Sequence, residues 1–75
     1  MGLSADDRRA LERVIARVER HLAIQADTAL YWAETGADFD RAVRGDGGAR
    51  VAGLNAHRAA ELAHELFVLK GLLER

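Results

Sequence analysis

The chain has 75 residues, and its length, composition and charge already exclude several classes of protein. It contains no cysteine, so disulfides and thiolate metal sites are excluded. With 11 basic and 12 acidic residues it is nearly neutral, which gives no electrostatic reason to expect nucleic acid or an anionic membrane as a partner.

No apolar run reaches the length of a membrane span, and the N-terminus lacks the apolar stretch of a signal peptide. We therefore expect a soluble cytoplasmic protein with a single domain over residues 1–75. One core of this size seldom supplies more than about 3–5 kcal/mol of stability. Bound metal or self-association is expected to supply the rest.

The first predicted element is a long amphipathic helix that begins after Ser4. Ser4 can cap the helix through its hydroxyl, and Asp6 and Asp7 suit the positive end of the helix dipole. Thr35-Gly36 predicts its end. Apolar residues recur at helical spacing along it, at Leu11, Val14, Ile15, Val18, Leu22, Ala26, Ala29 and Ala33.

A connection and a second helix follow. Residues 37–44 can form one short connecting helix, and Gly45-Asp46-Gly47-Gly48 predicts the turn that reverses the chain. The second long helix is predicted over residues 51–73. Its heptad seam is read as Val51, Leu54, Arg58, Glu61, Glu65, Val68 and Leu72.

That seam has apolar ends and a charged middle, which is the most informative feature of the sequence. Burying a charged group costs several kcal/mol unless it is paired or bound to a metal. The same frame on the first helix reads Leu11, Val14, Val18, His21, Gln25, Thr28 and Trp32, again with a polar middle.

The sequence therefore predicts an all-α fold, an antiparallel two-helix hairpin. In such a hairpin Gln25 lies about level with Glu61, and His21 with Glu65, so the two polar stretches should meet. Each helix would still have an uncovered apolar face. We expect two hairpins to pair into a homodimeric four-helix bundle, or a multiple of it.

The spacing of Glu61 and His64 is the candidate metal motif. Residues three apart on a helix are neighbours, so one carboxylate and one imidazole can hold the same ion. Glu65, His21 and Gln25 are the candidates for further ligands. Carboxylate-rich ligation with one histidine favours iron or manganese, with zinc as an alternative.

Glu61-x-x-His64 on the second helix of a short two-helix chain, with Tyr31-Trp32 late in the first, resembles the encapsulated-ferritin branch of the ferritin-like proteins. In that family each chain is half of a ferritin bundle, and a di-iron ferroxidase site assembles across the dimer interface. The resemblance implies that Glu61 and His64 bind iron, with ferroxidase activity as the corresponding chemistry. The family's glutamate on the first helix is replaced here by Gln25.

A second interpretation of the same residues involves no metal and no catalysis. Arg58, Glu61 and Glu65 can satisfy one another as an ion-pair layer that fixes how two helices pair. The protein would then be a helical homodimerisation or adaptor module. No nucleophile with a matched base, phosphate-binding loop or DNA-reading helix is evident to suggest another activity.

Overall fold

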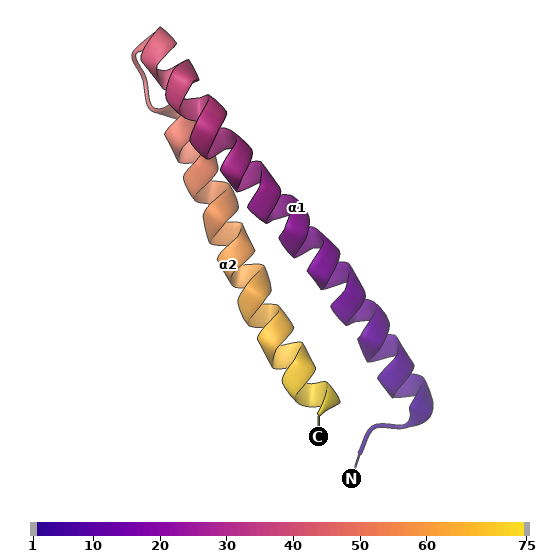
Figure 1. The fold of residues 1–75 in the computed structure, drawn as a ribbon. Helices are drawn as coiled ribbons and strands as arrows, with labels where there is room; N and C mark the ends of the chain where they lie inside the picture. The colour runs from indigo at the N-terminus through magenta and orange to yellow at the C-terminus, as the bar shows by residue number, and fades with distance from the viewer. Residues whose placement is uncertain (1, 75) are drawn as a thin grey trace.

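The computed structural model describes residues 2–74, which form two antiparallel α-helices joined by a tight turn (Figure 1). Helix α1 spans Ala5–Val43 and α2 spans Gly47–Leu73, and these residues include no strand. The molecule is a rod with extents of 58 × 14 × 11 Å. The prediction of an all-α helical hairpin is confirmed.

Helix α1 begins where the sequence predicts. The Ser4 hydroxyl oxygen accepts a hydrogen bond from the Asp7 backbone N–H at 3.1 Å. This bond satisfies one of the N–H groups that have no partner within the first turn. Asp6 and Asp7 place negative charge at the same end, which suits the helix dipole.

The predicted end of the first helix at Thr35-Gly36 is wrong. Helix α1 continues through Gly36 to Val43 and absorbs residues 37–43, so no separate connecting helix forms. Glycine inside a helix costs only about 1 kcal/mol relative to alanine, and the chain contains no proline to break the helix. Gly36 is instead one of only four buried residues in the described part of the chain.

The chain reverses direction over three residues, Arg44, Gly45 and Asp46. Arg44 adopts a left-handed conformation, with φ 54° and ψ 49°, and its backbone N–H donates to the Asp40 carbonyl. The Gly45 N–H donates to the same carbonyl at 3.0 Å. Gly47 and Gly48 lie inside α2, which therefore begins earlier than the predicted residue 51.

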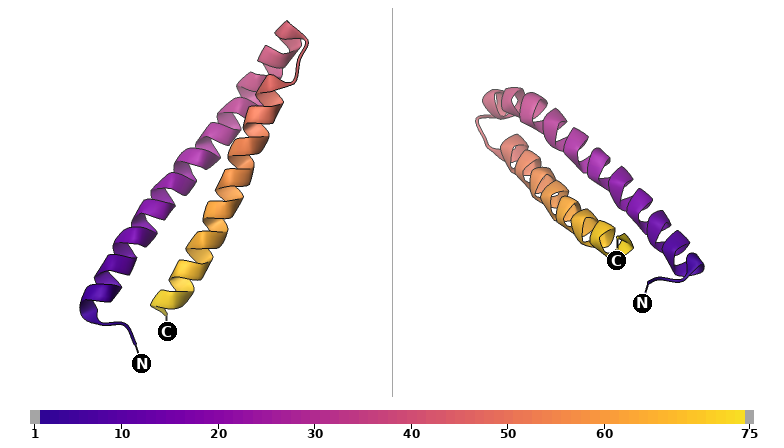
Figure 2. Two further views of the ribbon diagram at one scale, coloured as in Figure 1. Left: turned by 180° about the vertical axis from the view of Figure 1, so that it is seen from behind. Right: turned by 60° about the horizontal axis from the view of Figure 1, so that its bottom comes forward.

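The two helices lie closest together near the turn. A Cβ atom built on Gly48 would lie 2.4 Å from the Gly36 Cα atom, so the two backbones are in direct contact. Only glycine at both positions permits this approach. Figure 1 and the left view of Figure 2 show the helices diverging from the turn toward the termini.

Counting outward from the Gly36–Gly48 contact gives the register of the hairpin. It places Gln25 opposite Ala59 and Leu22 opposite Leu62. The residues of α1 that are at least partly buried, apart from Thr28 and Asp40, follow the alternating three-and-four spacing of a coiled-coil seam: Leu11, Ile15, Val18, Leu22, Gln25, Ala29, Trp32 and Gly36. Those of α2 do the same: Gly48, Ala52, Asn55, Ala59, Leu62, Leu66, Leu69 and Leu73.

This seam buries little apolar surface. Within residues 2–74, Ile15 (6% exposed) and Leu62 (5% exposed) are the only buried hydrophobic residues. The described helices contain no stretch long and apolar enough to cross a membrane.

Candidate functional site

The predicted seam of the second helix is wrong by one position. The residues that face α1 begin at Gly48 and Ala52, and Arg58, Glu61 and Glu65 are exposed. The true seam of α2 begins with the small residues Gly48 and Ala52, and Gly48 lets the two backbones come into direct contact. Near the turn, the large apolar residues Val51 and Leu54 lie on the neighbouring stripe of the helix, so the apolar pattern of the sequence predicts that stripe as the seam.

That neighbouring stripe is a distinct surface, which we call the outer stripe. It keeps the pattern of apolar ends and a charged middle. Leu54 is 70% exposed and Val68 is 48% exposed. The outer stripe consists of Val51, Leu54, Arg58, Glu61, Glu65, Val68 and Leu72.

Helix α1 contributes to the same side of the hairpin. An open hollow of about 330 Å³ is lined from α1 by Val14 and Val18, and from α2 by residues that include Glu65 and Val68. Ile24 (58% exposed) and Tyr31 (56% exposed) follow Val14 at helical spacing on this side. We call the outer stripe together with Val14, Ile24 and Tyr31 the outer face.

The outer face holds most of the large hydrophobic side chains that the hairpin leaves exposed. Of the twelve such residues in the described range 2–74, seven lie on it: Val14, Ile24, Tyr31, Val51, Leu54, Val68 and Leu72. Ile24 is not among the apolar residues from which the first helix is predicted, although its seven-residue spacing to Tyr31 places both on one line of the helix.

The charged middle of the outer stripe is locally paired. One Glu61 carboxylate oxygen lies 3.1 Å from His57 Nε2, and the other lies 3.5 Å from Arg58 Nη1. The Glu61 side chain is still 48% exposed. Both contacts are local, between residues three or four apart on α2, and solvent screening makes such pairs weak.

The predicted metal ligands are divided between two surfaces. Glu61 and Glu65 lie on the outer stripe, and His64 lines the hollow beside Glu65. Gln25 is half-buried in the seam, whereas His21 is exposed. In residues 2–74 no group of three or more His, Asp or Glu side chains is close enough to hold an ion.

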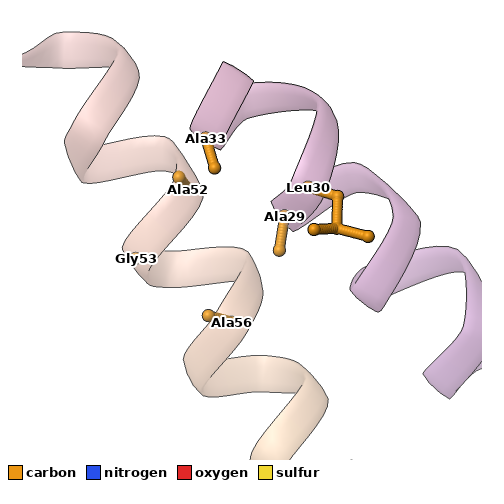
Figure 3. Close-up of a pocket in the computed structure, with 6 residues that line it drawn as sticks. All are labelled: Ala29, Leu30, Ala33, Ala52, Gly53 and Ala56. Carbon is orange, nitrogen blue, oxygen red and sulfur yellow. The ribbon is translucent and has the colours of Figure 1, made fainter. Parts of the chain in front are cut away.

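The opposite side of the hairpin has a different character. A shallow hollow near the turn is lined by small residues of both helices, with Leu30 as the one large side chain at its edge (Figure 3). Phe67 is 77% exposed and also lies off the outer face. The lining residues are Ala29, Leu30, Ala33, Ala52, Gly53 and Ala56.

No family model matches the chain, and neither a curated protein nor a solved structure matches it. The resemblance to encapsulated ferritins therefore stays a prediction from the motif residues.

Proposed function

We propose that this protein is a helical self-association module that pairs through its outer face with a second copy of itself. The observation that carries this proposal is the imbalance between the core and the surface. Two hydrophobic residues are buried in residues 2–74, whereas twelve large ones are exposed. An isolated hairpin of this kind lacks the buried area on which stable small domains depend.

Pairing of two hairpins would correct that imbalance. Each buried Val, Leu or Ile side chain contributes roughly 1.5–3 kcal/mol when it leaves water. The apolar ends of the outer stripe would supply such burial, and the charged middle would limit which alignments are acceptable. A second copy suits this surface because the chain is nearly neutral and the stripe carries both signs of charge.

The test is the molecular mass in solution, measured by sedimentation equilibrium over a range of protein concentrations. We expect the wild-type chain to form a dimer or a multiple of dimers. Leu54→Glu, on the outer face, should shift it strongly toward monomer. Phe67→Glu is the matched control, because Phe67 is as exposed and on the same helix but off the outer face.

A monomeric wild-type chain would refute self-association. An equal effect of the two substitutions would refute the assignment of the outer face. Circular dichroism on the same samples would show whether either variant has lost its helices.

Iron binding of the ferritin-like kind is the second candidate function. The observation that favours it is that Glu61 and Glu65 are exposed on the surface that we propose to be the interface, with His64 beside them. Because one chain brings too few ligands together, such a site needs carboxylates from two copies. Glu61 would have to exchange its contacts with His57 and Arg58 for the ion.

Elemental analysis of size-separated protein, purified without chelator and then exposed to Fe(II) in air, tests this candidate. Bound iron or manganese that is lost in Glu61→Ala, while the oligomer persists, would support a shared metal site. Metal bound equally well by that variant, or no metal bound by the wild-type oligomer, would refute it.

A further inference from the structure

The outer stripe of α2 has a nearly palindromic pattern about Glu61. Arg58 and Glu65 occupy corresponding positions of the stripe before and after Glu61, and they carry opposite charges. Leu54 is balanced by Val68, and further out Val51 is balanced by Leu72. A surface with this pattern is complementary to itself when one copy is turned end over end.

We infer that two hairpins pair about a two-fold axis that passes beside Glu61, with their turns at opposite ends and α2 antiparallel to α2 of the second copy. This inference rests on the proposed self-association and specifies its geometry. In this arrangement Leu54 packs on Val68 of the second copy, and Val51 packs on Leu72. Arg58 faces Glu65 of the second copy, and symmetry forms this ion pair twice.

The same two-fold axis must also bring compatible side chains of α1 together, and it does. Counting from the Gly36–Gly48 contact places Ile24 opposite Ala60, one residue or about 1.5 Å from the level of Glu61. The axis therefore brings Ile24 against Ile24 of the second copy, an apolar contact for a side chain that is 58% exposed in the hairpin. It also brings Arg17 to the level of Tyr31 of the second copy, where a cation can lie against the ring.

Repulsion between the two Glu61 carboxylates at the two-fold axis is offset by contacts that each Glu61 makes within its own chain. The two Glu61 carboxylates approach one another, but each already has Arg58 at 3.5 Å and His57 at 3.1 Å. The arginine can contact its own Glu61 and the Glu65 of the second copy together, because a guanidinium group has five N–H donors.

The other symmetric way to pair the outer faces places both turns at one end. Helix α1 then packs against α2 of the second copy, in the register of the hairpin itself. Ile24 would face Glu61 and Arg17 would face Val68, so apolar side chains would meet charged ones on both helices. The end-over-end arrangement avoids both mismatches.

Disulfide trapping tests the geometry directly, because the chain has no natural cysteine. Antiparallel packing at the usual interaxial distance of about 8–10 Å brings residues beside the axis within disulfide range. Under mild oxidation, Glu61→Cys should link to itself in high yield, and so should Ile24→Cys. Leu54→Cys should not link to itself, because its two copies would be about 21 Å apart along the direction of the helices.

A mixture of Leu54→Cys and Val68→Cys chains should link to each other. Ala63→Cys, on the same helix but off the outer face, is the control for random collision and should stay reduced. The wild-type mass from sedimentation is measured in parallel. A monomer would refute both self-association and this geometry.

A wild-type dimer in which Glu61→Cys does not link to itself would overturn the geometry alone. Linkage between Ile24→Cys and Glu61→Cys chains, with neither linking to itself, would identify the arrangement with both turns at one end and would likewise overturn it.

Discussion

The Asp40 carboxylate of α1 accepts a hydrogen bond from the Gly48 backbone N–H of α2 at 2.7 Å, and its second oxygen accepts one from the Ala49 N–H at 2.9 Å. Asp46, at the N-cap position of α2, makes no capping bond through its side chain. The second helix is therefore capped by the first, and one side chain joins the start of α2 to its partner helix.

Asp40→Ala should lower the free energy of unfolding by about 1–2 kcal/mol, because two N–H groups at the start of α2 lose their acceptor. Urea unfolding followed by circular dichroism measures the change. Asp38→Ala is the matched control, since Asp38 makes only an exposed pair with Arg41 at 3.4 Å. Equal stability of the two variants would contradict the capping role of Asp40.

Gly48→Ala should destabilise the hairpin by about 1–3 kcal/mol, because the added Cβ atom would overlap the Gly36 backbone, which can yield only if the helices separate. Gly53→Ala meets nothing within 4 Å and should instead stabilise α2 by about 0.5–1 kcal/mol through helix propensity. Thermal unfolding of both variants gives the comparison. A neutral Gly48→Ala would mean that the helices do not approach as closely as in this structure.

Leu62→Ala should cost about 2–5 kcal/mol, because Leu62 is one of the two buried hydrophobic side chains of the described chain. Phe67→Ala, at a residue that is 77% exposed, should change stability by less than about 0.5 kcal/mol. Denaturant unfolding at a fixed protein concentration measures both. A large loss in Phe67→Ala would show that the side opposite the outer face is also covered by a partner.

Arg58→Glu should weaken the dimer by about tenfold or more, because it places like charges opposite Glu65 of the second copy in two symmetric places. Adding Glu65→Arg on the same chain should recover much of that loss, since the pair re-forms with reversed signs. The dissociation constant from sedimentation or dilution calorimetry measures both steps. Failure of the second substitution to restore pairing would contradict the contact between Arg58 and Glu65.

The local Arg58–Glu61 contact at 3.5 Å is also lost in both variants, so recovery is expected to be incomplete. Circular dichroism at concentrations where the variants are monomeric separates this local effect from the effect on pairing.

The sequence by itself determined the all-α hairpin and the start of its first helix. Ser4 as the N-cap and the recurring apolar residues report short-range interactions, which depend only on neighbours along one helix. It also brought out the stripe from Val51 to Leu72, with its charged middle.

Only the tertiary structure decided which stripe of α2 faces α1. The two candidate seams differ by one residue, and the choice depends on how closely the backbones approach at Gly36 and Gly48. That contact selects the seam of small residues and leaves Glu61 exposed beside it. Gly36, which in sequence predicts the end of a helix, lies inside α1 for the same reason, because a close packing contact between distant residues outweighs a local preference of about 1 kcal/mol.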